Sequence, residues 1–386
     1  MKSKKINLQS KSNSILLLED GSFYRGRSFG AKKTEIGELV FHTGHSGYQE
    51  VLTDPSYRKQ IIVFTAPHIG NQGFHPDDWE SKACWASGAV MRNVVDAGFH
   101  WRRRQSLEAF LTEAKVPALI GPDTRRLVLK LRSSGNMWAV ISTETANIKE
   151  LEKHFDHKLS MEGLSLVREV STKTSYTWVT KSVNLMADHV EARSSKGGRC
   201  VVMDFGVKRQ ILRYLLDSGF EEVIVVPSRT SADEIMSLSP DALLLSNGPG
   251  DPAAEKEIVA EVQKLLGRFP IFGICLGHQI LALALGLQTY KLKFGHHGAN
   301  HPVKNLHRDF VEISSQNHGF AVLPASSKPE IEMTYINLND QSLAGFRHKG
   351  LNVCGIQFHP ESSPGPIDSA KLFEYFHENN WEEAFG

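Results

Sequence analysis

The stretch PIFGICLGHQILALAL, residues 270–285, decides the fold of the second half of the chain. Its apolar opening predicts a short buried strand at Pro270–Ile274, and its leucine spacing predicts a helix from Gly277 to the end of the stretch. Cys275 falls at the sharp turn between them, in the pattern G-x-C-x-G that begins at Gly273. Glycines without a Cβ let the two backbones pass closely. The stretch therefore predicts a cysteine version of the nucleophile elbow.

The chemistry expected at Cys275 follows from its place at a helix N-terminus. The helix dipole and the free N–H groups there favour the thiolate over the thiol, and the thiolate is the attacking species. The plainer alternative is a buried core cysteine, which is common for free thiols. The glycines on both sides and the strand–helix context favour the nucleophile. Cys200 and Cys354 lie in apolar strands and are predicted to be core, whereas Cys84 has no special context.

Short apolar strands alternate with helical segments on the N-terminal side of this stretch. This alternation predicts a doubly wound, mostly parallel α/β sheet of the flavodoxin-like kind. The preceding half indicates strands, loops and some helix, so we expect an N-terminal mixed α/β domain over residues 1–155. A connecting segment is expected at 156–196, before an α/β domain at 197–386. The predicted strands and helices of that domain are Arg199–Met203, Lys208–Ser218, Glu222–Pro227, Ala232–Leu238, Ala242–Leu245 and Ala254–Leu266.

Composition excludes several classes of protein. The 386 residues carry 44 basic and 43 acidic side chains, a net charge of +1, so a nucleic-acid-binding surface is not expected. Four cysteines without a CxxC pair indicate neither a zinc site nor a disulfide framework, which favours a reducing cytoplasm. The first apolar run, Ile15–Leu18, is too short for a signal peptide, and no transmembrane stretch or phosphate-binding loop is present.

The expected base for the cysteine is His359. It ends the predicted strand Val353–Phe358, at the carboxyl edge of the sheet where active sites of α/β folds collect. Glu361 follows two residues later and is predicted to orient the imidazole, as the acidic member of a triad does. The order Cys, His, Glu differs from the Ser, Asp/Glu, His order of α/β-hydrolases, which indicates a different family.

Two further features require an interpretation. The loop SNGPGDP, residues 246–252, follows a strand and can direct N–H groups at an oxyanion, with the N–H of Leu276 as a second donor. By itself the loop would indicate only a rigid turn.

His296, His297 and His301 form a cluster that we place in a loop. A metal site there is the minor alternative, because the run lacks an acidic or cysteine companion.

Taken together, GICLGHQ, SNGPGDP and HPE resemble the class I glutamine amidotransferases. Other segments, among them GYQEVLTDPSYRKQIIVFTAPHIGN, GPDTRRLVLKLR, DFGVKRQILR and KFGHHGANHPV, resemble the small subunit of carbamoyl-phosphate synthase, from about Gly37 to Pro366. The sequence departs from this family at FHTGHSG (41–47), where FNTSMTG is more usual, and at GNMW (135–138). The resemblance implies the triad Cys275, His359 and Glu361. It also implies L-glutamine contacts at Ser56, Gly248, Gly250, Leu276, Gln279, Asn317, Gly319 and Phe320.

The resemblance also implies a function. The chain would hydrolyse L-glutamine through a cysteine thioester and deliver ammonia to a separate large synthetase subunit, for arginine and pyrimidine synthesis. It would carry no cofactor or metal of its own, because ATP, Mg²⁺ and bicarbonate belong to that large subunit. Three alternatives remain at this point: an amidotransferase subunit of another synthetase, a catalytically weak regulatory subunit, and a cysteine peptidase of similar fold.

Overall fold

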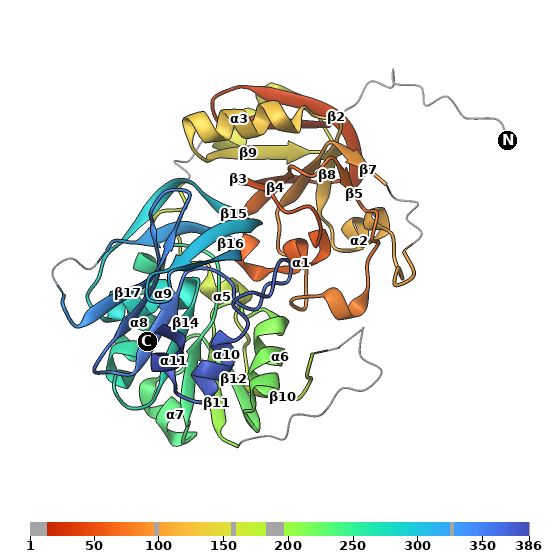
Figure 1. Ribbon diagram of the computed structural model, residues 1–386. Helices are drawn as coiled ribbons and strands as arrows, with labels where there is room; N and C mark the ends of the chain where they lie inside the picture. Colours follow the sequence, from red (N-terminus) through yellow and green to blue (C-terminus); the bar gives the residue numbers. More distant parts are fainter. Residues whose placement is uncertain (1–13, 96–99, 156–159, 183–196, 325–327, 386) are drawn as a thin grey trace. The chain divides into compact units, whose positions relative to one another are not determined.

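The chain divides into two compact units (Figure 1). The computed structural model describes residues 14–95, 100–155, 160–182, 197–324 and 328–385. Unit 1 comprises Met1–Phe41, Lys59–His75 and Ala86–Leu159, and unit 2 comprises His42–Arg58, Pro76–Trp85 and Ser160–Gly386. The division is thus interleaved in sequence, and two N-terminal segments join the C-terminal unit. The predicted segment 156–196 is described only at 160–182, which lies in unit 2.

Unit 1 is built on a closed β-barrel in the strand order β1-β2-β8-β6-β4-β3-β9. Closure leaves no strand edge unpaired. The strand SILLL predicted near residue 14 is fully buried in it. The barrel strands are β1 (Ser14–Leu18), β2 (Phe23–Gly30), β3 (Thr34–His42), β4 (Gln60–Phe64), β6 (Gly88–Met91), β8 (Pro117–Ile120) and β9 (Met137–Ser142). The remaining elements are β5 (His68–Ile69), β7 (Asn93–Val94), α2 (Leu107–Glu113), α3 (Thr124–Ser134), α4 (Ile148–Leu151) and η3 (Glu152–Phe155).

Unit 2 contains a ten-stranded sheet in the order β10-β12-β11-β13-β14-β19-β18-β17-β15-β16. Five adjacent strands, in the order β12-β11-β13-β14-β19, run parallel to one another. The other pairings in the sheet are antiparallel. The strands are β10 (Tyr176–Trp178), β11 (Arg199–Asp204), β12 (Glu222–Pro227), β13 (Ala242–Leu245), β14 (Ile271–Ile274), β15 (Thr289–Asn305), β16 (Phe310–Val322), β17 (Ile331–Asn337), β18 (Leu343–His348) and β19 (Val353–Ile356).

Helices cover both faces of the parallel strands (Figure 1). The larger ones are α6 (Arg209–Ser218), α7 (Ala232–Ser237), α8 (Lys256–Leu265), α9 (Leu276–Ala284), α10 (Leu372–His377) and α11 (Trp381–Phe385). Short elements complete the unit: α1 (Tyr48–Thr53), η1 (Pro55–Tyr57), η2 (Pro76–Asp78), α5 (Val167–Val170) and η4 (Pro252–Ala254). The predicted doubly wound α/β class is confirmed, and each helix and strand predicted in this half is present.

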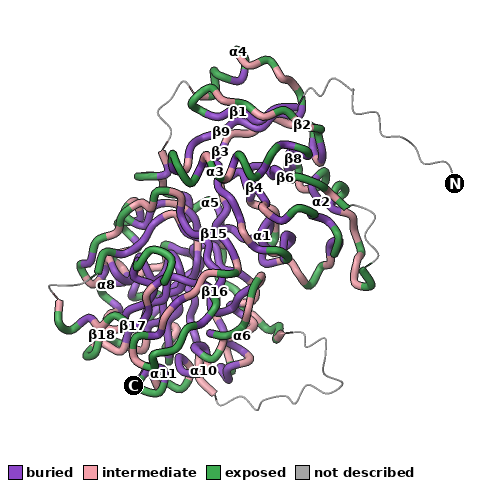
Figure 2. The backbone as a smooth tube through the Cα atoms, turned by 45° about the horizontal axis from the view of Figure 1, so that its top comes forward, coloured by how far each residue is buried: buried purple, intermediate pink, exposed green. Residues whose placement is uncertain are grey.

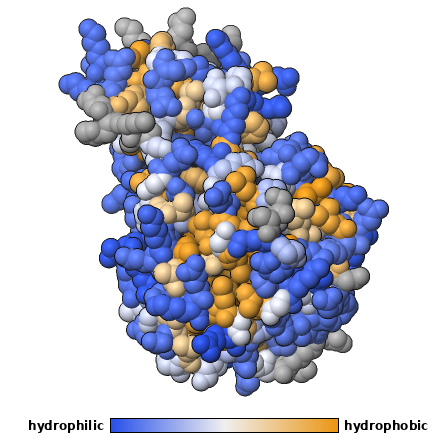
Figure 3. All heavy atoms as spheres, turned by 90° about the vertical axis from the view of Figure 1, so that its left-hand side faces the viewer, coloured by the Kyte–Doolittle hydropathy of each residue, from blue (hydrophilic) through white to orange (hydrophobic). Residues whose placement is uncertain are grey.

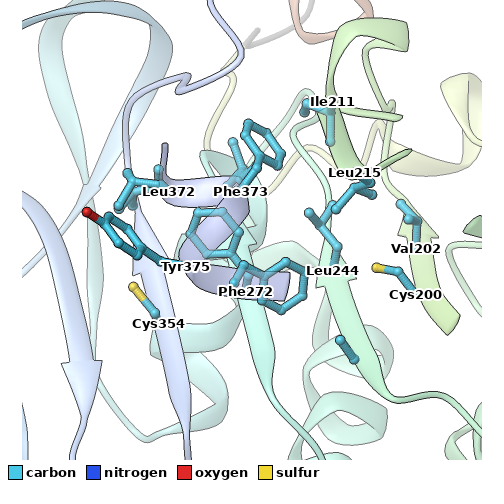
Figure 4. Packing of buried hydrophobic residues seen from close by; sticks show 14 of the residues in the cluster. Cys200, Val202, Ile211, Leu215, Leu244, Phe272, Cys354, Leu372, Phe373 and Tyr375 are labelled. Carbon is cyan, nitrogen blue, oxygen red and sulfur yellow. The ribbon is translucent and has the colours of Figure 1, made fainter. Parts of the chain in front are cut away.

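Alternating residues of each strand build two separate cores. On one face Cys200, Val202 and Phe272 pack against α6 and α10, as Figure 4 shows. On the other face Val201 and Met203 pack with residues of α7, α8 and α9. The burial map in Figure 2 accordingly shows the strands inside and exposed residues on the outer helices. Because both faces are covered, these strands are apolar throughout, which is why they stand out in the sequence.

The face of the molecule drawn in Figure 3 is mainly hydrophilic. On that face, hydrophobic side chains gather in more than one area, the largest near the middle of the view. No helix within the described ranges has the length and apolar character that crossing a membrane requires.

Candidate active site

The carboxyl ends of four parallel strands bring the candidate residues of unit 2 together. Asp204 ends β11, Asn247 follows β13, Cys275 follows β14 and His359 follows β19. The chain order reverses between β11 and β13, because β12 lies on one side of β11 and the later strands lie on the other. Ligands of open α/β sheets bind at such a reversal. The candidate residues therefore lie at the carboxyl edge of the sheet, beside the reversal of strand order.

The turn at Cys275 has the strained geometry of a nucleophile elbow. Cys275 has φ 55° and ψ −104°, a conformation that costs a non-glycine residue roughly 1–3 kcal/mol. Its N–H donates to the carbonyl of Ile356 at 2.9 Å, and Gly277 N–H donates to Ser246 at 3.0 Å. A Cβ on Gly277 would lie 2.0 Å from the carbonyl oxygen of Leu245. Only glycine fits there, so the predicted reason for the G-x-C-x-G pattern is correct.

His359 and Glu361 form a buried pair beside the cysteine. His359 Nδ1 lies 2.6 Å from Glu361 Oε1, and the two residues are 2% and 1% exposed. Burial alone would lower the pKa of His359. The charges of Glu361 and Cys275, with the hydrogen bond to Glu361, outweigh burial and raise that pKa to about 10. The surroundings thus favour the imidazolium form of His359.

A lysine that was not among the predicted site residues completes this pair. Lys208 Nζ donates to Glu361 Oε1 at 2.8 Å and also to the carbonyl of Ser362. Burial opposes ionisation of Glu361, but the positive charges of Lys208 and His359 lower its pKa to about 2. Glu361 therefore stays ionised at neutral pH. Lys208 lies within the segment DFGVKRQILR, and its position after the β11 turn is the signal that could have identified it.

A polar network joins the cysteine to the segment around Ser56. Cys275 Sγ lies 3.5 Å from the carbonyl oxygen of Asn317, whose side-chain amide donates to Asp54 at 2.9 Å. Asn247 donates to Ser56 Oγ at 3.0 Å. The structure therefore places predicted residues Ser56 and Asn317 in one network with Cys275. Asp54 and Asn247 were missed, although both lie in the quoted motifs TDPSY and SNGPGDP.

The two glycines predicted in the loop after β13 have different structural roles. A Cβ on Gly248 would lie 2.2 Å from the carbonyl oxygen of Phe205 and 2.9 Å from the side chain of Leu276. Gly250 has φ 94° and pairs with Ser165 in an isolated β-bridge. Both positions therefore exclude larger residues. The N–H of Leu276, the first residue of α9, has no acceptor within the helix and is free to stabilise an anion.

The remaining predicted residues lie where α9 meets β16. Gln279 Nε2 donates to the carbonyl of Phe320 at 2.7 Å and to Gln357 at 3.0 Å. Phe320 is buried against Met161, Leu164 and Leu166, residues from the partly described connecting segment. Gly319 precedes Phe320 on the same strand. All eleven predicted site residues thus lie in unit 2.

A small cavity adjoins His359. Its volume is about 10 Å³, and Asp54, Tyr57, Lys208 and Asn317 contribute to its lining. A cavity of this size can hold about one water molecule, provided that polar partners surround it. The lining supplies such partners, so one small polar molecule fits beside the imidazole.

The histidine cluster is not in a loop, as the sequence analysis expected, but in the long strand β15. The glycines of this stretch do not interrupt the strand, because β15 runs through Gly295 and Gly298 and pairs with β16. His297 donates to Asn317 at 2.8 Å, and His296 contacts Asp340 at 2.9 Å. Within the part of the chain that the structure describes, no group of His, Cys, Asp or Glu is arranged to hold a metal ion.

The fold and this site define a class I glutamine amidotransferase domain. The family model "Glutamine amidotransferase class-I" matches residues 201–379, and "Carbamoyl-phosphate synthase small chain, CPSase domain" matches residues 16–141. The carbamoyl phosphate synthase small chains of Nostoc sp. and Synechocystis sp. are each 49% identical, with 94% of both chains covered. The chloroplastic small chain of Arabidopsis thaliana is 44% identical over 94% of this chain and 84% of its own. The chain belongs to the carbamoyl phosphate synthase small chain family.

Proposed function

We propose that this chain hydrolyses L-glutamine to glutamate and ammonia at Cys275 and delivers the ammonia to a carbamoyl phosphate synthase large chain. The observation that carries the proposal is the buried array of Cys275, His359 and Glu361 at the carboxyl edge of the sheet. Its strained cysteine, raised imidazole pKa and ionised glutamate are the properties that nucleophilic catalysis by a thiolate needs.

In the first half of the reaction, the Cys275 thiolate attacks the side-chain amide carbon of glutamine. The new C–S bond forms as the carbonyl π electrons move to oxygen, and the N–H groups of Leu276 and the loop at Gly248 stabilise that oxyanion. The imidazolium of His359 donates its proton to the amide nitrogen. The C–N bond then breaks, which releases ammonia and leaves a glutamyl thioester.

In the second half, the neutral imidazole of His359 takes a proton from water, and the oxygen attacks the thioester carbon. Collapse of the second tetrahedral intermediate breaks the C–S bond, releases glutamate and restores the thiolate–imidazolium pair. Glu361 holds the imidazole through Nδ1 and stabilises its charge. Lys208 keeps Glu361 ionised and in place.

The residues around the nucleophile would bind the rest of the substrate. Ser56 and Asn317, tied together through Asp54 and Asn247, would fix one side of the amino acid. Gly248 and Gly250 would let its backbone approach closely, and Gln279, Gly319 and Phe320 would form the opposite wall. Because Gln279 already donates to two acceptors, its side chain would hold the wall in position.

The product explains why a partner is needed. Free ammonia in neutral water is mostly protonated and then has no nucleophilic lone pair, so it must pass to the consuming site without exposure to solvent. We assign ATP, Mg²⁺ and bicarbonate to the large chain, no cofactor to this one, and a cytoplasmic location to the complex. An amidotransferase subunit of another synthetase is less consistent with relatives that match along 94% of the chain.

The proposal is tested in the complex with the large chain by Cys275→Ser. We expect glutamine-dependent carbamoyl phosphate synthesis to be lost, while synthesis from added ammonium chloride continues. The core substitution Cys354→Ser is the matched control, because that thiol is equally buried but lies on β19 away from the elbow. If glutamine still supports synthesis in Cys275→Ser, the nucleophile is wrongly assigned. If peptides are cleaved and glutamine is not, the reaction class is wrong.

A further inference from the structure

A second cavity in unit 2 is not explained by glutamine hydrolysis. It has a volume of about 270 Å³, and none of Cys275, His359 and Glu361 lines it. Its aromatic lining residues are Trp85, Tyr176 and Trp178, and its charged ones are Lys82, Arg209 and Asp204. The volume is just below the range of about 300–1,000 Å³ that is typical of small-molecule sites. The cavity can therefore hold a ligand the size of a mononucleotide or smaller.

The two cations interact with nearby carboxylates only at a distance, Arg209 with Glu80 and Lys82 with Asp204. Within the described ranges, no acceptor lies within hydrogen-bonding distance of the Arg209 guanidinium or the Lys82 ammonium group. By contrast, Arg58 and Arg199 of the same unit both pair with glutamates, at 2.7 Å and 2.6 Å. Arg209 uses only its main-chain N–H, which donates to the carbonyl of Glu80. An Arg guanidinium lining a cavity without an acceptor is suited to a carboxylate or phosphate of a ligand.

The acidic residue of the lining, Asp204, offsets only part of this positive charge: burial raises the pKa of its carboxyl, and the charge of Lys82 partly opposes that rise. Asp204 is 5% exposed, and its carboxylate accepts from the N–H groups of Thr172, Gly206 and Val207 at 2.7 to 2.9 Å. These bonds use the carboxylate to hold the turn after β11. Two cations against one anion leave the lining with a net positive charge, so the cavity attracts an anion.

The aromatic walls are fixed in position by hydrogen bonds of their own. Trp85 Nε1 donates to Ser81 Oγ at 2.8 Å, and Trp178 Nε1 donates to the carbonyl of Thr180 at 2.6 Å. Tyr176 is 39% exposed, and burial of its hydroxyl raises the pKa to about 12, so the hydroxyl stays protonated and can donate. Rigid aromatic faces beside cations are suited to a planar ring that carries negative charge.

The cavity also adjoins two segments that carry residues of the proposed glutamine site. Pro55 lines it and precedes Ser56, and Val207 lines it and precedes Lys208. Gly206, also in the lining, has φ 126° and would bring a Cβ within 3.4 Å of the Gly248 Cα. A ligand in the cavity would therefore contact the reverse side of the proposed glutamine site.

We propose that this cavity binds a small planar anion, an aromatic or heteroaromatic ring bearing a phosphate or carboxylate group. The ring packs against Trp85 and Trp178, and the anionic group pairs with Arg209 and Lys82. The site is separate from the proposed glutamine pocket, and the binding of such a ligand does not depend on glutamine hydrolysis.

Isothermal titration calorimetry of the full chain tests the proposal with adenosine 5'-monophosphate and 2-naphthoate as ring-bearing anions. Adenosine supplies a ring without an anion, and inorganic phosphate supplies an anion without a ring. We expect at least one ring-bearing anion to bind with 1:1 stoichiometry and a Kd below about 1 mM, at least about tenfold tighter than either half-ligand. Failure of both ring-bearing anions to bind below about 5 mM, or equal affinity for adenosine and its monophosphate, overturns the assignment.

Variants locate the binding site. Arg209→Gln and, separately, Lys82→Gln are expected to weaken binding about tenfold and about threefold, because Arg makes the bidentate contact and Lys a single one. Arg125→Gln makes the same change of charge at an exposed position of α3 in unit 1 and should leave the affinity unaltered. Lys82 is exposed, so its variant remains informative if Arg209→Gln fails to fold. Unchanged affinity in both cavity variants places the ligand elsewhere and contradicts the proposal.

Discussion

Glu361 Oε1 is shared by two cations: Lys208 Nζ lies 2.8 Å from it, and His359 Nδ1 lies 2.6 Å from it on the other side. All three residues are at most 2% exposed. For a buried carboxylate with one positive partner, the attraction between the two charges often does little more than offset the free energy of hydration lost on burial. With two partners the charge of Glu361 is well compensated, and it remains available to hold the imidazole.

Removing the lysine is predicted to destabilise the fold and the triad together. Lys208→Met leaves Glu361 buried with one partner, so we expect the free energy of unfolding to fall by about 3–5 kcal/mol. Glutaminase kcat should fall by at least about tenfold, because the imidazole loses its fixed partner when Glu361 takes up a proton. Denaturant unfolding and glutamate release measure the two effects.

Lys349→Met is the matched control for this change. Lys349 pairs with Glu332 at 3.5 Å, but its side chain is 59% exposed. An exposed pair contributes about 0–1 kcal/mol. If both variants lose the same small amount of stability, the shared carboxylate has no special structural role.

The charge of Glu361 is predicted to set the pH range of thiolate reactivity. In Glu361→Gln, the charge of Glu361 no longer opposes burial, and only Cys275 still raises the pKa of His359, so that pKa should fall well below about 10. The pH above which His359 loses its positive charge then moves downward, and alkylation of Cys275 by iodoacetamide at pH 7 should slow about tenfold or more. Glu312→Gln alters another largely buried carboxyl, outside the triad. Identical pH profiles for the wild type and Glu361→Gln would contradict the electrostatic role.

The parallel sheet and the elbow could be predicted from sequence because their causes are local. Strands buried on both faces must be apolar throughout, and Gly277 must be glycine because the Leu245 carbonyl passes 2.0 Å from where a Cβ would lie. Lys208 could not be identified in this way. Its partner Glu361 lies 153 residues away, and only the folded sheet brings them together.

The sequence also did not indicate that segments near the N-terminus belong to unit 2. Residues 42–58 follow a barrel strand in the sequence, but they pack with the amidotransferase unit. The reason is polar pairing over long sequence distances: Asp54 accepts from Asn317, and Ser56 accepts from Asn247. The histidines near 296 were assigned to a loop because glycines flank them, but pairing between β15 and β16 overrode that local preference.

The elbow glycine is predicted to tolerate no side chain. In Gly277→Ala the Cβ would lie 2.0 Å from the Leu245 carbonyl oxygen, so the turn must move away from β13. We expect a loss of about 1–3 kcal/mol in unfolding free energy and at least a tenfold loss of glutaminase kcat, because the nucleophile moves with the turn. Gly350→Ala is the control, since the nearest atom to its added Cβ would be 3.7 Å away. Wild-type activity in Gly277→Ala would show that the close approach is not needed.

Acid stability is predicted to depend on buried neutral histidines. Burial lowers the pKa of His42, His278 and His297 to about 3, whereas the unfolded chain has histidine pKa values near 6.5. The stability that depends on these neutral histidines is fully present above pH 6.5. It is lost as the pH falls from 6.5 toward 3, because over that range only the unfolded state takes up protons. Between these pH values, each such histidine lowers the free energy of unfolding by about 1.4 kcal/mol for every pH unit of acidification. His278 packs against Phe346, so His278→Phe keeps an aromatic ring at this position. Between pH 4 and 6, the free energy of unfolding of this variant, measured with denaturant, should fall less steeply with acidification, by the contribution of one histidine. Replacing the exposed His45 with Asn should leave the slope unchanged. An unaltered slope in His278→Phe would mean that this histidine is not held neutral by the fold.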